Sequence, residues 1–240
     1  MFRTYCYKLA FRVIIFLIVL YGYIVRPEIY EYIVDRPLLG QIPWTYIIWG
    51  ILMFSMITHM LPTKSITMGS KKRFVENFHV NEGYDKLNLY QYVQKNNIAA
   101  IWVLIIWLSF NAIFGIFYLR GTLEEKELIL ISVFFYVCDL ICVVIWCPFQ
   151  SYIIKNKCCV NCRIFNWGHF MMFTPLLFIV NFFTWSLFFT SLIVMLRWEL
   201  TLLKYPERFW EESNTTLQCV NCKDKICKFK GAKFIKDGND

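Results

Sequence analysis

The stretch IAAIWVLIIWLSFNAIFGIFY, residues 98–118, decides the class of this protein. It contains no charged residue, and a helix needs roughly 20 apolar residues to cross a bilayer. Four other apolar stretches follow the same pattern along the chain, at residues 9–25, 44–61, 128–147 and 170–196. The sequence therefore predicts five hydrophobic segments in a membrane.

The amino-acid composition indicates the same class. Of the 240 residues, 58% are hydrophobic, 19% are aromatic and 23 are phenylalanine. A soluble protein of this size cannot enclose so much apolar surface, and disordered or collagen-like chains have different compositions. We therefore expect an all-α, polytopic membrane helix bundle. This excludes a soluble enzyme and a small, disulfide-rich secreted domain.

The expected organisation is one membrane domain with a small cap. Residues 1–204 are predicted to form the transmembrane bundle, with cytoplasmic loops at 62–97 and 155–167. Residues 205–240 are predicted to form a cytoplasmic, cysteine-containing tail. The loops and the tail together would make a cysteine-rich cap on the cytoplasmic face.

The distribution of basic residues predicts the orientation of the bundle. Twelve lysines and arginines lie in the N-terminal segment up to Arg12 and in the second and fourth loops, whereas the two other connections hold four. Basic residues remain on the cytoplasmic side of a membrane, so we expect the N-terminus inside. The Ile-, Lys- and Asn-rich composition favours a bacterial cytoplasmic membrane.

The lipid bilayer is the expected partner of these basic residues. The run Lys71-Lys72-Arg73 is expected to lie near anionic lipid headgroups. Arg12, inside the first stretch, is expected to extend its long side chain to the membrane surface. Nucleic acid is not an expected partner, because no stacking surface accompanies the basic loop.

The last apolar stretch, residues 170–196, allows two arrangements. Its centre, Asn181-Phe-Phe-Thr-Trp-Ser186, is polar, and such residues are unusual at a bilayer midplane. The stretch is either one tilted helix or a re-entrant hairpin that turns near Asn181. A hairpin keeps the tail, with nine basic residues from Arg197 onward, on the cytoplasmic side. We favour the hairpin for this reason and because it places every cysteine motif on one side.

Ten cysteines occur in the chain, and most of them are clustered. The tetrad Cys-Val-Asn-Cys occurs twice, once in the fourth loop and once in the tail. A Cys-x2-Cys turn allows two thiolates to face one ion, and two such turns make a tetrahedral sulfur site. The predicted metal ligands are Cys159, Cys162, Cys219 and Cys222, with Cys158 and Cys227 as further candidates. The metal is left open between iron, an iron–sulfur cluster and zinc.

Three functions are compatible with these cysteines. We expect a redox or electron-transfer role for the metal site, with a redox partner or a quinone, because the surplus thiols are unexplained by a structural zinc ion. A membrane thiol–disulfide oxidoreductase is the second, since Cys-x2-Cys pairs also tune redox thiols. A transporter or accessory subunit with structural zinc, using Asp139 as its polar site, is the third. Whether the protein is an enzyme stays open.

Asp139 is the most unusual residue of the apolar stretches. By helical rise it lies about 16 Å into the fourth stretch, near the midplane, where a carboxylate is costly. We expect a protonated acid that relays protons or donates a hydrogen bond to a quinone-like ligand. The structural alternative is a hydrogen bond to Asn111 or Ser109, or a stretched pair with Arg12. Nearby Cys138 and Cys142 are expected to be apolar packing residues.

Overall fold

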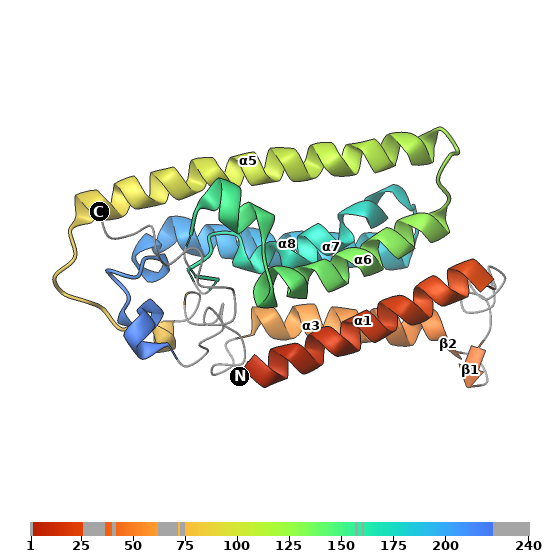
Figure 1. The fold of residues 1–240 in the computed structure, drawn as a ribbon, viewed down its shortest axis with the longest axis horizontal. Coiled ribbons are helices and arrows are strands. Elements are labelled where there is room, and N and C mark those ends of the chain that lie inside the picture. The colour runs from red at the N-terminus through yellow and green to blue at the C-terminus, as the bar shows by residue number, and fades with distance from the viewer. Residues whose placement is uncertain are drawn as a thin grey trace.

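The structure is a computed structural model that describes residues 2–25, 37–39, 42–61, 72, 75–156, 158–159 and 161–222. Within these ranges the chain is helical, apart from a short antiparallel hairpin of β1 (Pro37–Leu39) and β2 (Ile42–Pro43) (Figure 1). Cys227 lies outside the described residues.

Four helices of the described residues are long and apolar enough to cross a membrane. They are α1 (Phe2–Val25), α5 (Lys86–Leu119), α6 (Glu125–Val144) and α8 (Phe182–Lys204). The fifth, α3 (Trp44–Met60), has 17 residues. A helix of that length spans about 26 Å, short of the roughly 30 Å hydrocarbon core. The expected membrane class agrees with this pattern of four long apolar helices, whereas the five expected segments stay a prediction.

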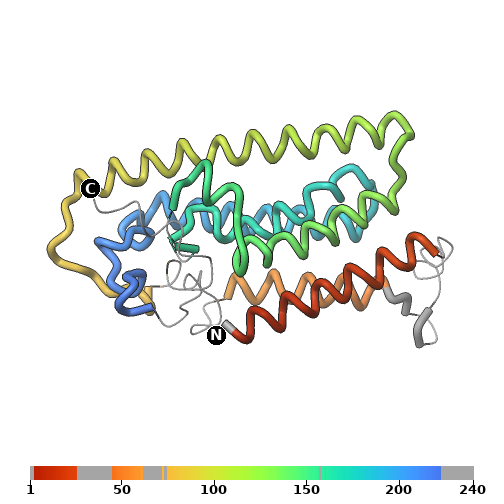
Figure 2. The backbone as a smooth tube through the Cα atoms, viewed as in Figure 1, coloured from red at the N-terminus to blue at the C-terminus, as the bar shows by residue number. Residues whose placement is uncertain are grey.

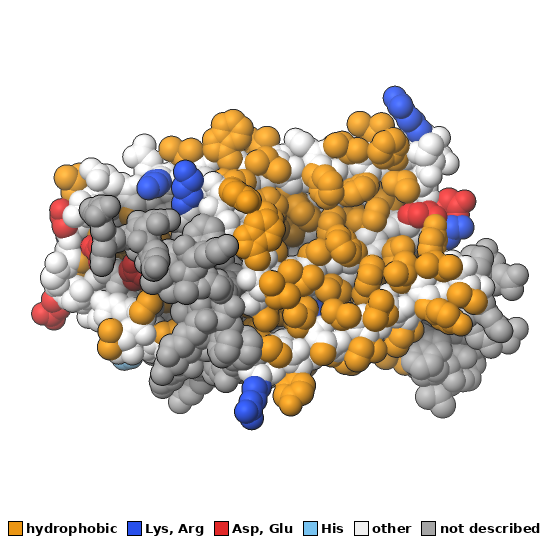
Figure 3. All heavy atoms as spheres, viewed as in Figure 1, with side chains coloured by type: hydrophobic (Ala, Val, Ile, Leu, Met, Phe, Trp, Pro, Cys, Tyr) orange, Lys and Arg blue, Asp and Glu red, His pale blue; other side chains and the backbone are white. Residues whose placement is uncertain are grey.

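The helices form an elongated bundle in which α1 packs along α6, and α3 packs along α8 (Figure 1). The backbone trace shows the connection between α5 and α6 at one end of the bundle, beside the turn before α8 (Figure 2). The start of α5 and the end of α8 lie at the opposite end. Hydrophobic side chains cover the helices between the two ends, and most charged side chains lie near the ends (Figure 3).

Helix α5 begins much earlier than the apolar stretch that predicts it. Asp85 caps the helix by accepting a 2.9 Å hydrogen bond from the Leu87 amide, and the helix continues for 34 residues. The first turns are covered by the tail, where Trp210 stacks on Tyr92 with ring centroids 5.7 Å apart. Residues 86–97 of the predicted second loop are therefore helical and continue directly into the apolar run. The cytoplasmic location of this loop stays a prediction.

The last apolar stretch is broken, as the hairpin interpretation expects. It comprises α7 (Gly168–Phe173), the 3-10 segment η4 (Thr174–Phe178) and then α8. Asn181 caps α8 by accepting a 2.9 Å hydrogen bond from the Thr184 amide. Both α7 and η4 pack against α8. The turn near Asn181 is confirmed, and the single tilted helix is wrong.

The tail folds back on the segment before α5. Val80 and Asn214 form an isolated antiparallel bridge, and the Asn81 amide donates to Ser213 O at 3.0 Å. Asn214 is fully buried, and its side-chain amide donates to Arg208 O at 2.9 Å. The Asn-Thr-Thr sequence at 214–216 resembles a glycosylation sequon, but its asparagine is enclosed by the folded chain.

Candidate functional site

A cavity of about 420 Å³ lies beside the second half of α6. Five of the chain's cysteines contribute to its wall, together with Asp139 and Gln150. These cysteines are Cys138, Cys142, Cys147, Cys159 and Cys162. Most of the remaining wall is aromatic, including Trp107, Phe110, Phe134, Phe135, Phe149 and Phe165. The sequence assigned these thiols to two separate groups, whereas the fold places both groups around one space.

The end of α6 brings two of these thiols together. In a continuous helix, residues five apart point in directions about 140° apart. Pro148 disfavours helix at the residue before it, and α6 ends at Val144. Cys147 therefore lies beyond the helix, and its thiol lies next to the thiol of Cys142 in the wall of the cavity. The interpretation of Cys142 as a packing residue alone misses this contact.

The π-helical segment η2 (Phe149–Ile154) follows and positions the fourth loop. Gln150 Oε1 accepts a 3.3 Å hydrogen bond from Cys159 Sγ, and Gln150 Nε2 donates to Asn156 O at 3.0 Å. Lys155 ends the segment in the left-handed conformation, with φ of 51°. These contacts hold the first Cys-x2-Cys turn against the wall of the cavity.

The fourth loop is also fixed to α8. The guanidinium of Arg163 forms a bidentate ion pair with Glu199, whose Oε1 also accepts a 2.8 Å hydrogen bond from Trp167 Nε1. Trp198 Nε1 donates to Arg163 O at 3.0 Å. Arg163 is buried, so the pair is shielded from solvent. Sequence reasoning missed this network, because no local spacing links the loop to a residue of α8.

Lys72 lies in the protein interior beside the same loop. Its side chain is 1% exposed, and Nζ donates to Cys162 O at 3.2 Å. Burial lowers the pKa of Lys72 to about 8, and burial raises the pKa of the Cys162 thiol to about 12. The expectation that Lys72 contacts lipid headgroups is therefore wrong, because its ammonium is enclosed near the rings of Trp198 and Phe209. Lys71 and Arg73 lie outside the described residues.

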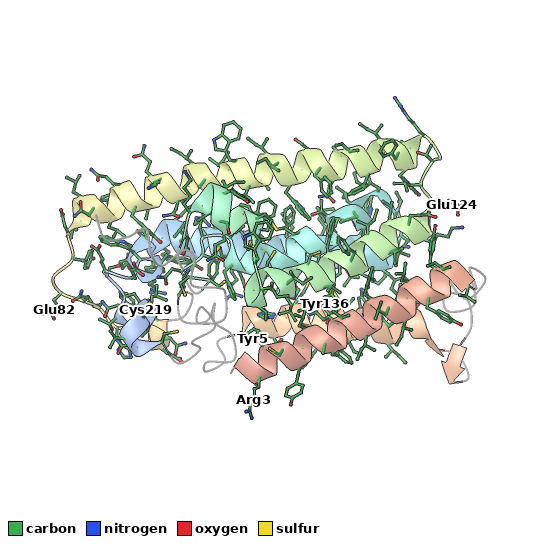
Figure 4. All side chains as sticks on the ribbon, in the orientation of Figure 1. Arg3, Tyr5, Glu82, Glu124, Tyr136 and Cys219 are labelled. Carbon is green, nitrogen blue, oxygen red and sulfur yellow. The ribbon has the colours of Figure 1, made fainter. Side chains whose placement is uncertain are left out.

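In each Cys-Val-Asn-Cys tetrad, the amide of the last cysteine bonds to the carbonyl of the first. The Cys162 amide donates to Cys159 O at 3.1 Å, and the Cys222 amide donates to Cys219 O at 3.3 Å. Cys219 is exposed and lies at the end of the bundle that also holds Glu82 (Figure 4).

The tail reaches the fourth loop by direct contacts. Leu217 packs against Cys158, and Asn161 Nδ2 donates to Glu211 Oε2 at 2.5 Å. Within the described ranges, however, no three His, Cys, Asp or Glu side chains are close enough to hold a metal ion. The four-cysteine metal site stays a prediction, with its candidate ligand Cys227 outside those ranges.

Asp139 is not alone in the bundle. Its Oδ2 accepts a 2.8 Å hydrogen bond from Arg12 Nη1, which also donates to Tyr136 O at 2.7 Å. The Arg12 guanidinium lies 3.9 Å from the centroid of the Tyr136 ring, where α6 meets α1 (Figure 4). The pair with Arg12, which is one of the structural alternatives for Asp139, is therefore present in the bundle. The role of Asp139 in proton transfer or ligand binding stays a prediction. The guanidinium of Arg12 is thus held by groups of α6.

Gly168 makes room for this carboxylate. A Cβ atom on Gly168 would lie 2.3 Å from Asp139 Oδ1, closer than any van der Waals contact allows. The next residue, His169, forms an edge-to-face ring contact with His59 of α3, with centroids 4.9 Å apart. Helices α1, α3, α6 and α7 thus bring Arg12, His59, Asp139 and His169 into one region. The histidine contact has no signal in the sequence, because it joins separate helices.

No protein-family model, curated protein or solved structure matches the chain.

Proposed function

We propose that this protein is a membrane thiol–disulfide oxidoreductase whose reactive thiols line the cavity beside α6. The observation that carries the proposal is the thiol–thiol contact of Cys142 and Cys147, in a wall shared with Cys159 and Cys162. Cysteines that only pack in an apolar core have no reason to gather around one cavity. The proposal takes the second of the three functions that the cysteine pattern allows.

The chemistry of the site is a reversible dithiol–disulfide step. Cys142 and Cys147 each lose a thiol proton, two electrons pass from the pair to an exchanging disulfide, which becomes a dithiol, and a sulfur–sulfur bond of about 2.05 Å forms. Cys147 can make this approach because it lies beyond the last turn of α6. The pair Cys159 and Cys162 would then exchange with it through a mixed disulfide.

The tail would hold the pair of thiols that exchanges with a partner protein. Cys219 is exposed, and Leu217 joins its segment to Cys158 of the fourth loop. A protein dithiol or disulfide could therefore exchange first with Cys219 and Cys222. The distribution of basic residues supports a cytoplasmic location for this end, with the N-terminus inside a bacterial membrane.

Asp139 would act at the edge of the same cavity. It lines the wall next to Cys138 and is held in place by Arg12. Its role as a proton relay or as a hydrogen-bonding partner of a ligand remains part of the proposal. The transporter alternative gains no support from Asp139, because Arg12 pairs its charge.

Controlled oxidation tests the proposal. The purified, reduced protein is treated with diamide, the remaining thiols are alkylated, and the peptides are mapped by mass spectrometry. We expect a Cys142–Cys147 disulfide that dithiothreitol reverses, and the same result in Cys6→Ser, which changes a cysteine outside the cavity wall. Complete alkylation of both residues after diamide treatment would contradict the proposal.

A cysteine-ligated metal site remains the second candidate. The equivalent backbone hydrogen bond in each tetrad and the contact of Leu217 with Cys158 support it. Zinc, iron or an iron–sulfur cluster would be held by Cys159, Cys162, Cys219 and Cys222, with Cys158 or Cys227 as additional ligands. Elemental analysis of anaerobically purified protein tests this: a stoichiometric metal that is lost in Cys219→Ser supports the site, and its retention in all four single serine variants refutes it.

A further inference from the structure

We infer that the cavity beside α6 binds a quinone ring, and that this quinone is the oxidant of the Cys142–Cys147 pair. The inference rests on the proposed thiol function and names its second substrate. It follows from the size of the cavity, from the aromatic residues of its wall and from the exposed position of its rim.

The size and the wall of the cavity suit a planar, apolar ring. Its volume of about 420 Å³ falls within the roughly 300–1,000 Å³ that is usual for small-molecule sites. Trp107 and Phe135 lie with ring centroids 4.8 Å apart, and Trp107 meets Phe149 edge to face at 6.2 Å. Aromatic rings such as these favour offset or edge contacts with another flat ring.

The rim of the cavity lies on the hydrophobic outer surface of the bundle. Phe110, Phe134 and Trp146 contribute to the wall and are also 44%, 47% and 46% exposed. Neighbouring positions of α5, such as Ile106 and Ile113, are also exposed hydrophobic side chains. On the face drawn in Figure 3, side chains of this kind gather over the middle of the bundle. In a bilayer this rim would face lipid, so the substrate that reaches it must be soluble in lipid. Quinones with isoprenoid tails satisfy this condition, whereas water-soluble oxidants do not.

The thiols of the wall supply what the reduction of a quinone requires. A quinone takes up two electrons and two protons to become a quinol. Oxidation of Cys142 and Cys147 breaks two S–H bonds, forms one S–S bond and releases two electrons and two protons. The two half-reactions therefore balance without another oxidant, reductant or proton donor. Charged side chains are rare in this wall: Asp139 is its one acid or base, and Arg12 pairs with it.

An acyl chain of a lipid is the competing occupant of such a space. It would fill the cavity without accepting electrons, so quinone turnover distinguishes the two ligands. The reduced protein is mixed with a short-chain ubiquinone or naphthoquinone in detergent, and the quinone absorbance is followed. We expect one quinone reduced per protein as the Cys142–Cys147 disulfide first forms, and up to two more as this disulfide exchanges with the other two pairs. The reaction should be lost in Cys142→Ser and in Cys147→Ser.

A pair of tryptophan substitutions tests whether the quinone acts in the cavity. Ile141→Trp fills the cavity from its wall, and we expect the quinone concentration for half-maximal rate to rise at least tenfold. Ile105→Trp is the matched control, because Ile105 is 48% exposed on α5 and does not line the cavity. Equal effects of the two substitutions would overturn the assignment of the site.

The oxidation experiment separates the two proposals. If diamide forms the Cys142–Cys147 disulfide but neither quinone is reduced, the thiol function stands and the quinone assignment is wrong. If diamide also fails, the proposed function itself is wrong. If a quinone is reduced equally by Cys142→Ser, other thiols are responsible and the inference is again overturned.

Discussion

Replacing Arg12 by methionine should destabilise the bundle, because the substitution leaves Asp139 without its cation. Arg12 Nη1 lies 2.8 Å from Asp139 Oδ2 and 2.7 Å from Tyr136 O, and the two side chains are 18% and 33% exposed. An unpaired aspartate deep in a bilayer costs about 2.5–3.5 kcal/mol. Partial exposure lowers the cost, so we expect a loss of about 2–3 kcal/mol, or roughly 30- to 150-fold in the unfolding equilibrium.

The double variant distinguishes an ion pair from two independent residues. Arg12→Met together with Asp139→Leu removes both charges. We expect the free energy of unfolding of this double variant to be at least about 1 kcal/mol higher than the sum of the two single losses predicts. The assay is reversible unfolding in mixed micelles with increasing dodecyl sulfate, followed by tryptophan fluorescence. Arg3→Met is the matched control, since Arg3 is an exposed residue of the same helix. Additivity of the single losses within about 0.5 kcal/mol would refute the reasoning.

Three other predictions concern single side chains. Gly168→Ala places a methyl group 2.3 Å from Asp139 Oδ1 and should cost about 1–3 kcal/mol in the same unfolding assay, whereas Gly50→Ala, with nothing within 4 Å, should be nearly neutral. Exposed Cys219 should react with a maleimide faster than buried Cys162 at pH 7.5, because burial limits access to Cys162 and raises its pKa, which lowers the fraction of reactive thiolate. Similar labelling rates for the two thiols at pH 7.5 would contradict this. Arg163→Lys loses the bidentate contact with Glu199 and should cost about 1–3 kcal/mol in thermal stability, so an unchanged Tm would show that the pair is dispensable.

Hydropathy and turn chemistry predicted the main features of the fold. The membrane class follows from apolar stretches long enough to span, and the turn near Asn181 follows from polar residues that are unusual at a bilayer midplane. The start of α5 at Lys86 was not predictable from apolar length, because it depends on Trp210 packing on Tyr92 across the chain.

The candidate site was only partly predictable. The cysteines themselves stand out in the sequence, but their convergence depends on two local events. Pro148 ends α6 early enough for Cys147 to meet Cys142, and η2 turns the chain so that Gln150 holds Cys159. Neither event follows from the spacing of cysteines.

Contacts between distant segments account for the other differences. Arg12 and Asp139 are 127 residues apart in sequence, so their pairing has no local pattern. Lys72 belongs to a basic run typical of a surface loop, yet its ammonium lies beneath the fourth loop and the end of α8. Charge patterns predict the side of a membrane better than they predict the burial of one residue.

A redox titration of the cavity thiols tests the central claim most directly. The protein is equilibrated in dithiothreitol buffers of graded potential, quenched with acid and alkylated, and the peptides that contain Cys142 and Cys147 are quantified by mass spectrometry. The account predicts that both residues are protected together, along a two-electron curve in which the ratio of disulfide to dithiol changes tenfold per about 30 mV. Two thiols that stay alkylatable in the most oxidising buffer, or that titrate independently, would contradict it.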